Sequence, residues 1–301
     1  MARRLYPTPA RSSPPTRPET DLARCCRYRL VMVAIRAPSA DLAARIDAFW
    51  SVRGDGRAGT SFHEFFPDAG ANLILRLSPS GCRLVLLGPV TDLAAVERDE
   101  RAEYLGVRFR TGQTPALADV RSSELTNAHV ELSALGGVRV DDLAERLSSR
   151  TDLASRQLVL EELLRRSSPL VRSARARQLA ALVDARGGQM RVDALAAALG
   201  VHVRSLERLC VGELGMSPKR LARLARLRHV LARMHAGGFG TLADLAIACG
   251  YSDQPHLIRD FKGLTGRPPG DGTAFRPRRL DALPRTQVVH RYRARDGARS
   301  G

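Results

Sequence analysis

The chain has 301 residues, which is long enough for two ordinary domains. Hydrophobic residues make up 44% and charged residues 26%, a composition typical of a folded globular protein and not of a disordered one. The longest apolar run, Leu30 to Ile35, is far too short to span a bilayer, and Arg3-Arg4 precede no apolar segment of signal-peptide length. We therefore expect a cytoplasmic protein that does not contact membranes.

The net charge of +17 is concentrated in one part of the chain. Residues 28–169 carry 18 arginines and 19 acids, whereas residues 170–280 carry 19 lysines and arginines and only 8 acids. An arginine-rich composition explains the high isoelectric point of the whole chain, but not why its middle part is neutral. A block with this charge attracts a polyanion, and duplex DNA offers one phosphate per ~1.7 Å.

Both ends of the chain are predicted to be disordered tails. Residues 1–27 are rich in Pro, Ser, Thr and Arg and poor in apolar residues, and residues 278–301 are Arg-rich without any periodicity. We assign no function to either tail.

From residue 28 to about residue 110 the pattern favours β-structure. Leu42 to Phe49 is the exception, because its apolar residues have helical spacing. Turn signals at Pro67-Asp68-Ala69-Gly70, Pro79-Ser80-Gly81 and Gly88-Pro89 separate the other segments. The predicted strands are Tyr28 to Ile35, Phe62 to Phe66, Asn72 to Leu77, Arg83 to Leu87 and Tyr104 to Phe109.

From Pro115 to Arg166 the pattern becomes helical, and Ser167-Ser168-Pro169 predicts a linker. Residues 28–168 are therefore expected to form a small β barrel or sandwich with helices. The whole chain is predicted to be of the α+β class, with an all-α domain at residues 171–277. The predicted helical core residues are Leu143, Leu147, Leu153, Leu160, Leu163 and Leu164.

No pattern in the N-terminal domain predicts catalysis. His63-Glu64 lies on a predicted strand, as in metal sites of cupin-like barrels, but no second His or carboxylate cluster accompanies it. No Ser/His/Asp motif, phosphate-binding glycine loop or paired-acid motif occurs in residues 28–169. We therefore expect no enzyme, no cofactor and no metal.

The cysteines and aromatic residues each leave two interpretations open. Cys25, Cys26, Cys82, Cys210 and Cys249 lack metal-site spacing, and we expect reduced thiols. An aromatic group could line an apolar effector pocket, although core packing is the preferred interpretation. This group consists of Phe49, Trp50, Phe62, Phe65 and Phe66.

An internal repeat dominates the C-terminal third. Leu195-Ala196-Ala197-Ala198-Leu199-Gly200 recurs fifty residues later as Leu245-Ala246-Ile247-Ala248-Cys249-Gly250. Further on, Leu206, Arg208, Cys210, Gly215 and Pro218 match Leu257, Arg259, Phe261, Gly266 and Pro269 at a separation of fifty-one residues. The turn after the repeated glycine thus differs by one residue in length. Because the unit occurs only twice, it does not build a solenoid.

Each copy has the pattern of a helix-turn-helix unit. A short helix (Val192 to Leu199; Leu242 to Cys249) ends at a glycine, which tolerates a left-handed helix cap. A second helix begins near His202 in the first copy and near Asp253, a good N-cap, in the second. Between the copies, Pro218 to Met234 predicts one long helix. Its expected exposed cations are Lys219, Arg220, Arg223, Arg226, Arg228 and Arg233.

With these motifs, residues 171 to 277 resemble the AraC/XylS family of bacterial transcription regulators. The resemblance depends on LAxxxG-V-x-x-R-x-L-x-R-L, on L-G-M-S-P, and on D-L-A-I-A-C-G-Y-S-D-Q-P-H-L-I-R-D-F-K-x-x-T-G-R-P-P. Residues 28–168 resemble a sensory domain of uncharacterised ligand found in part of this family, and dimerisation is its second expected role. The resembling segments are Ala48-Phe49-Trp50, Phe66-Pro67-Asp68, Leu73-Ile74-Leu75, Leu87-Gly88-Pro89-Val90-Thr91, Gly106-Val107-Arg108-Phe109 and Glu124-Leu125.

The resemblance implies that two recognition helices enter successive major grooves, which lie ~34 Å apart. It also implies double-stranded DNA, RNA polymerase, a small-molecule effector and a second copy of the chain as partners. Arg208 and Arg259 either read a base or contact a phosphate, and linker arginines are expected to contact phosphate or solvent. The DNA-binding residues implied are Val203, Arg204, Glu207, Arg208, Gln254, Pro255, Ile258, Arg259 and Lys262.

The sequence departs from the family pattern at two positions. His202 stands where the family usually has a capping Ser, and Cys210 where it usually has Phe. These departures bear on the first unit's base preference and packing, and not on the fold.

Two other functions are weighed against a sequence-specific regulator. A nonspecific, nucleoid-type DNA-binding protein is disfavoured by the two-unit geometry. A cysteine-dependent DNA-alkylation repair protein is disfavoured because Cys25-Cys26 has neither metal-site spacing nor activating partners.

Overall fold

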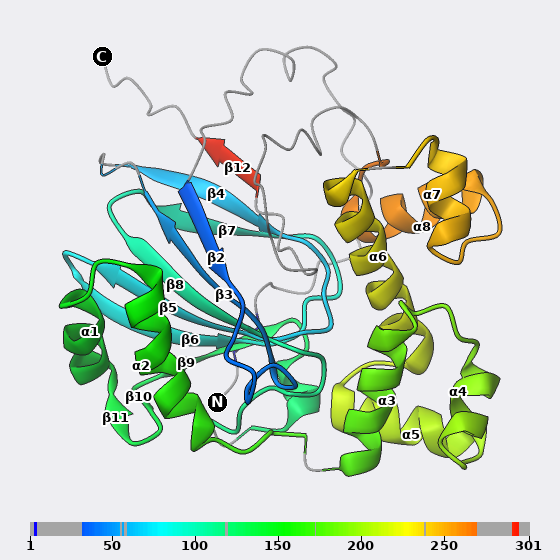
Figure 1. The fold of residues 1–301 in the computed structure, drawn as a ribbon, viewed down its shortest axis with the longest axis horizontal. Helices are drawn as coiled ribbons and strands as arrows, with labels where there is room; N and C mark the ends of the chain where they lie inside the picture. Colours follow the sequence, from blue (N-terminus) through cyan, green and yellow to red (C-terminus); the bar gives the residue numbers. More distant parts are fainter. Residues whose placement is uncertain are drawn as a thin grey trace.

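The computed structural model describes residues 3–4, 32–54, 56, 59–117, 120–171, 173–237, 239–269 and 291–294. Antiparallel sheets and two helices make up the N-terminal part, and α3 to α8 make up the part that follows (Figure 1). The predicted α+β class is confirmed. The predicted tails, 1–27 and 278–301, lie outside the described residues, apart from the short strands β1 (Arg3–Arg4) and β12 (Arg291–Ala294).

The main sheet has seven antiparallel strands in the order β1-β9-β6-β5-β8-β3-β2. A second sheet has the order β12-β4-β7, and β10 pairs with β11 in a small ribbon. The bounds are β2 (Met32–Arg36), β3 (Ile46–Arg53), β4 (Thr60–Phe65), β5 (Asn72–Ser78), β6 (Gly81–Leu87), β7 (Ala94–Asp99), β8 (Glu103–Phe109), β9 (Ala128–Leu132), β10 (Ala134–Leu135) and β11 (Val138–Arg139).

Two helices, α1 (Val140–Ser148) and α2 (Leu153–Arg165), cover the main sheet and close its hydrophobic core (Figure 1). Leu143 and Leu147 of α1 and Leu160 and Leu163 of α2 pack in one cluster with strand residues such as Leu84. All five are at most 3% exposed, as expected for core positions. Of the predicted helical core leucines, Leu153 is half-buried against this cluster, and the other five are buried: Leu143, Leu147, Leu160, Leu163 and Leu164.

The expected helix at Leu42 to Phe49 is wrong. The chain turns at residues 40–45 and then enters β3, which lies between β2 and β8. Residues 46 to 50 are all buried, because a strand flanked on both sides and covered by helices buries both faces. Such a continuous apolar run lacks the two-residue alternation of a half-buried strand. Some of its apolar residues then stand three or four positions apart, as they do in a helix.

Besides β3, two strands of five or more residues were not predicted. β7 contains Glu97, Arg98 and Asp99, so that its polar composition conceals it, and β9 lies in the region expected to be wholly helical. β9 does show strand alternation in its burial, with Ala128, Val130 and Leu132 inward. Its five residues are too few to outweigh the helical pattern on either side.

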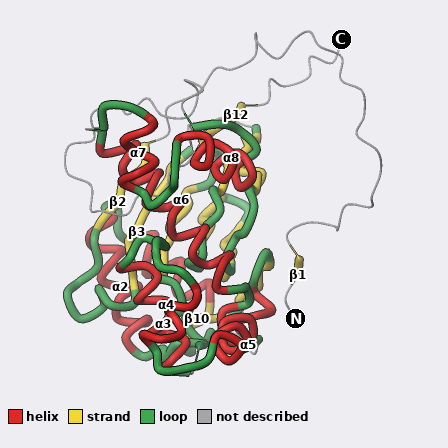
Figure 2. The backbone as a smooth tube through the Cα atoms, turned by 90° about the vertical axis from the view of Figure 1, so that its right-hand side faces the viewer, coloured by secondary structure: helices red, strands yellow, loops and turns green. Residues whose placement is uncertain are grey.

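The C-terminal part consists of α3 (Ala174–Ala185), α4 (Val192–Ala198), α5 (Val203–Leu214), α6 (Pro218–Ala236), α7 (Leu242–Ala248) and α8 (Gln254–Thr265). The predicted helices agree with α4 to α8 within two residues, whereas α3 was not predicted as a helix. Figure 2 shows α4 and α5 at one end of α6, and α7 and α8 at the other. The buried residues of α3 to α8 form one continuous hydrophobic cluster.

The main sheet depends on one close approach in its centre. Gly106 of β8 lies directly opposite Trp50 of β3. A Cβ added at Gly106 would lie 1.9 Å from an atom of the Trp50 indole ring. The indole therefore occupies the space that any other residue at position 106 would fill.

We predict that Gly106→Ala lowers the free energy of unfolding by about 1–3 kcal/mol, because the new methyl group must displace a buried indole. Gly212→Ala is the matched control, since no atom lies within 4 Å of its added Cβ. In a helix interior this control should stabilise the chain by about 0.5–1 kcal/mol. Urea unfolding of both variants measures the difference, and equal midpoints would contradict the close approach.

Candidate nucleic-acid interface

The first helix-turn-helix unit is formed by α4 and α5. Gly200, at the turn between them, has φ +62°. Leu206 and Cys210 of α5 are fully buried against the C-terminal core. The helix ends at Gly215, whose left-handed backbone caps it. At the other end His202 occupies the N-cap position, but its side chain makes no capping hydrogen bond.

The second unit repeats this arrangement with α7 and α8 and has better helix caps. Thr241 and Asp244 form a capping box at the start of α7. Asp253 caps α8, because its carboxylate accepts a hydrogen bond of 2.6 Å from the His256 amide. Gly266 ends α8 in the left-handed conformation, as Gly215 ends α5. The predicted N-cap at Asp253 is therefore present.

The residues predicted to bind DNA lie at equivalent positions of the two recognition helices. Adding fifty-one to Val203, Arg204, Glu207 and Arg208 gives Gln254, Pro255, Ile258 and Arg259. All four positions are exposed in α5, and in α8 Pro255 and Arg259 are exposed while Gln254 and Ile258 are half-buried. Lys262 is also exposed, and its equivalent in α5 is Val211, which is 52% exposed. Each recognition helix thus presents the same side, near its N-terminus, outside the core.

The linker helix α6 holds the second unit through a network that the sequence did not predict. Arg223 of α6 makes an ion pair of 2.6 Å with Asp260 of α8, whose side chain is 10% exposed. The Tyr251 hydroxyl donates a hydrogen bond of 3.1 Å to the same carboxylate. Burial raises the pKa of Tyr251, so its hydroxyl keeps the proton that it donates. Arg226 lies over the Tyr251 ring at 5.2 Å.

Four of the six cations expected to be exposed on α6 are instead bound within the chain. Besides Arg223 and Arg226, Arg228 pairs with Asp184 of α3 at 2.7 Å, and Arg220 pairs with Asp92 of the N-terminal domain at 2.7 Å. Lys219 and Arg233 remain exposed. Helical periodicity places polar residues on the outer side of a helix, but cannot show that other elements cover that side. The expectation that the linker arginines contact phosphate or solvent is therefore wrong for Arg223 and Arg228.

The described cysteines have the environment of structural thiols. Burial raises the pKa of Cys210 to about 12 and that of Cys249 to about 11. The pKa of Cys82 is also raised, first by burial and then by Asp141. These thiols stay protonated near neutral pH and are poor nucleophiles. Cys25 and Cys26 lie outside the described residues.

Neither a metal site nor the aromatic pocket is visible in the described part of the chain. No group of three His, Cys, Asp or Glu side chains there could hold a metal ion. Phe49 and Trp50 are at most 4% exposed and belong to the core of the sheet domain, as the preferred interpretation expected. Phe66 packs against the cluster of the C-terminal helices. The side chains of Phe62, His63 and Glu64 lie outside the described residues.

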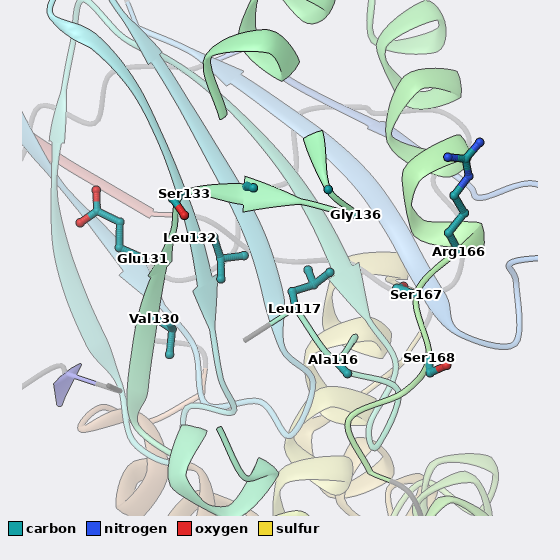
Figure 3. A pocket seen from close by; sticks show the side chains of 12 residues that line it. Ala116, Leu117, Val130, Glu131, Leu132, Ser133, Gly136, Arg166, Ser167 and Ser168 are labelled. Carbon is teal, nitrogen blue, oxygen red and sulfur yellow. The ribbon is translucent and has the colours of Figure 1, made fainter. Parts of the chain in front are cut away.

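A cavity of about 710 Å³ lies between β9 and the segment that leads into the C-terminal domain (Figure 3). Val130, Leu132 and Ser133 line one side of it, and Arg166 and Ser168 line the other. The segment is held in place, because the Ala116 amide donates a hydrogen bond of 2.8 Å to the Ser168 carbonyl oxygen. The cavity is therefore bordered by a fixed connection between the two domains.

Two family models match the chain. Residues 195–273 match a family described as helix-turn-helix domain. Residues 35–131 match a domain of unknown function, DUF6597. No curated protein matches the sequence.

The solved structures that match parts of this chain include proteins from three bacteria. The C-terminal domain of AraT, a response regulator from Geobacillus stearothermophilus, has 22% identity and a TM-score of 0.31, over 32% of this chain and 81% of that one. A transcriptional regulator with an AraC-type DNA-binding domain from Chromobacterium violaceum has 24% identity and a TM-score of 0.27, over 30% and 80%. ToxT from Vibrio cholerae O395 has 11% identity and a TM-score of 0.40, over 81% and 96%.

The repeated units, their exposed recognition helices and the matching family model define a DNA-binding transcription regulator. Residues 195–273 match the helix-turn-helix domain, and the DUF6597 domain at residues 35–131 precedes it in the chain. Among the described residues, none of the helices has the length and apolar character needed to cross a membrane.

We predict opposite effects on stability at the equivalent N-caps of the two recognition helices. Asp253→Ala removes a cap and should lower the free energy of unfolding by about 1 kcal/mol, whereas His202→Ser supplies one and should raise it by a similar amount. Urea unfolding of the free chain measures both, and a destabilised His202→Ser variant would show that His202 has another partner.

The cap at Asp253 should also depend on pH. The hydrogen bond from the His256 amide lowers the pKa of Asp253 from its ordinary value of 3.8. The stabilisation is therefore present above pH 3.8 and is lost as the pH falls through the lower pKa of the folded state. In Asp253→Asn this part of the pH dependence should be absent.

Proposed function

We propose that the chain binds a specific DNA sequence with α5 and α8 in successive major grooves on one side of the duplex, ~34 Å apart. The supporting observation is that both helices leave the same positions outside the core, close to their N-termini. A shared hydrophobic cluster joins the two units, so both can bind the same duplex at the same time. The positive charge of residues 170–280 favours approach to the phosphates.

The side chains at these positions suit base readout. Arg204, Arg208 and Arg259 can each donate two hydrogen bonds to guanine. Gln254 can pair with adenine, and Ile258 can pack against a thymine methyl group. Lys262, Val203, Glu207 and Pro255 complete the proposed surface. Lys262 is assigned to phosphate, since a single ammonium group positions the protein without reading a base.

We further propose that the N-terminal domain modulates DNA binding in the cytoplasm, in response to an effector. The cavity next to residues 166–168 supports this, because a molecule bound there would touch the connection between the domains. RNA polymerase and a second copy of the chain are the other proposed partners. A thermal shift of the free chain with a metabolite collection tests the effector, and the absence of any stabilising compound would count against it.

The central test is selection of binding sequences for the full chain from random duplex DNA. We predict that a defined sequence emerges and that Arg259→Ala weakens binding to it by about 1–3 kcal/mol. The loss should be smaller on a scrambled duplex, because only a base contact discriminates between sequences. Fluorescence anisotropy at fixed salt concentration measures both affinities.

Arg139→Ala is the control, because this arginine is 76% exposed in the sheet domain, outside the proposed surface. An equal loss for Arg259→Ala on every duplex would reassign Arg259 to phosphate contact. Equal affinity of the unaltered chain for all sequences at moderate salt would contradict sequence-specific binding and favour a nonspecific DNA-binding protein.

A further inference from the structure

Two loops of the sheet domain hold the C-terminal helices, and both contain segments whose role the proposed function leaves open. The first docking loop is residues 88–93 and includes most of the Leu87-Gly88-Pro89-Val90-Thr91 segment. The second docking loop is residues 121–127 and includes Glu124-Leu125. Both lie within the region that matches DUF6597.

The first docking loop reaches the linker helix and the second unit. Arg220, in the first turn of α6, donates hydrogen bonds to the Thr91 carbonyl oxygen (2.5 Å) and to the Asp92 carboxylate (2.7 Å). The next residue, Leu93, donates its amide to the carbonyl oxygen of Leu264 in α8 at 3.3 Å. Three consecutive residues therefore touch both α6 and the C-terminal end of the second recognition helix.

The second docking loop holds the C-terminal end of the first recognition helix. The Thr126 hydroxyl donates a hydrogen bond of 3.3 Å to the carbonyl oxygen of Gly215, the residue that caps α5. A Cβ added at Gly215 would lie 2.9 Å from the Ser123 Cα, so the backbones are in direct contact. Each recognition helix is thus anchored at the end opposite to its proposed base-reading residues.

Asn127 joins the two loops. Its side-chain oxygen accepts a hydrogen bond of 2.8 Å from the Thr91 amide, and its side-chain nitrogen donates one of 2.9 Å to the Thr91 hydroxyl. Its own amide donates to the Pro89 carbonyl oxygen at 2.8 Å. Among the described residues, Asn127 alone has a positive φ, +55°, without being glycine. Asn tolerates this conformation better than most residues.

A continuous hydrogen-bonded path therefore runs from the first unit to the linker helix. The Thr91 hydroxyl, which accepts from Asn127, donates to Asp92 at 2.8 Å, and Asp92 accepts from Arg220. Thr91 is only 8% exposed, so water competes weakly for its hydrogen bonds. The path would transmit a displacement of one loop to the other.

We propose that Asn127 is a positioning residue for DNA recognition: by joining the docking loops, it fixes the separation of α5 and α8 and thereby the spacing of DNA half-sites that the chain accepts. This inference rests on the proposed two-groove binding. Two linked modules gain affinity for one duplex only when their geometry lets both bind at once. A rigid connection between the docking loops limits binding to a few half-site spacings. A loosened connection lets the chain bind a wider range of spacings, but with lower affinity.

The test uses the full chain and duplexes obtained by the selection described above. Affinity is measured on the selected duplex, on duplexes with one, two or five base pairs inserted between the half-sites, and on duplexes with one half-site scrambled.

Asn127→Gly is the main variant, because glycine keeps the positive φ without the side-chain hydrogen bonds. Asp92→Asn, which removes the charge that binds Arg220, is the second. Glu162→Gln is the control, since it breaks the exposed pair with Arg146 elsewhere in the sheet domain.

We expect Asn127→Gly to bind the selected duplex about tenfold more weakly and to show a flatter dependence on spacing. On duplexes with one intact half-site its affinity should equal that of the unaltered chain, because the unit that binds them is unchanged. Asp92→Asn should change both measurements in the same direction, and Glu162→Gln should change neither.

An unchanged spacing profile in Asn127→Gly would overturn the proposal. An equal loss on duplexes with one half-site would also overturn it, since Asn127 would then support the units themselves. If Asn127→Gly is unfolded at the assay temperature, Asp92→Asn decides by the same criteria. Failure of the selection to yield any sequence would instead refute the proposed function.

Discussion

The enclosure of the linker helix is the constraint on which the rest of the structure depends. Nine residues of α6 are buried, and helix-turn-helix units lie at both of its ends (Figure 2). An arginine in such a position loses hydration and must be compensated by a carboxylate or an aromatic ring. The chain supplies Asp260 from α8, Asp184 from α3, Asp92 from the sheet domain and the ring of Tyr251. The linker helix α6 therefore contacts α3, α8 and the sheet domain through its arginines.

Several charged side chains with little exposure lie at the junction of the two domains. Asp184 accepts from Arg228 and lies near Thr111 of the sheet domain, whose hydroxyl is 3.4 Å away. Burial raises the pKa of Asp184 although Arg228 lowers it. On the sheet side, Arg108 is 2% exposed and pairs with Asp47 at 3.1 Å and with Asp68. Each of these charges has its partner within its own domain, and the hydrogen bond from Thr111 to Asp184 crosses the junction between the domains.

The sequence predicted the local features of the chain and missed the nonlocal ones. The repeat located α4, α5, α7 and α8, because the spacing of Leu and Gly is set within each unit. It could not show that Arg223 pairs with Asp260, thirty-seven residues away, since no short-range pattern marks the two as partners. Strand β3 was mistaken for a helix because burial on both faces removes the alternation of a strand. Asn127 carries no signal in the sequence, and the resemblance that covers Thr91 could not show its partner, because the role of both residues depends on two loops meeting.

The two helix-turn-helix units are stabilised in different ways. The second has side-chain caps at Thr241 and Asp253, and fills its core with Phe261. The first has no side-chain hydrogen bond at either N-cap, Arg191 or His202, and has the smaller Cys210 at the position of the phenylalanine.

The sheet domain contacts the first unit at two places. Gly112 of the sheet domain approaches both Ala180 and Leu214, and the second docking loop touches Gly215. The sheet domain therefore contacts the C-terminal end of α5, a helix that has no side-chain hydrogen bond at its N-cap. His202 and Cys210 thus belong to the recognition helix whose C-cap, Gly215, accepts a hydrogen bond from Thr126 of the sheet domain.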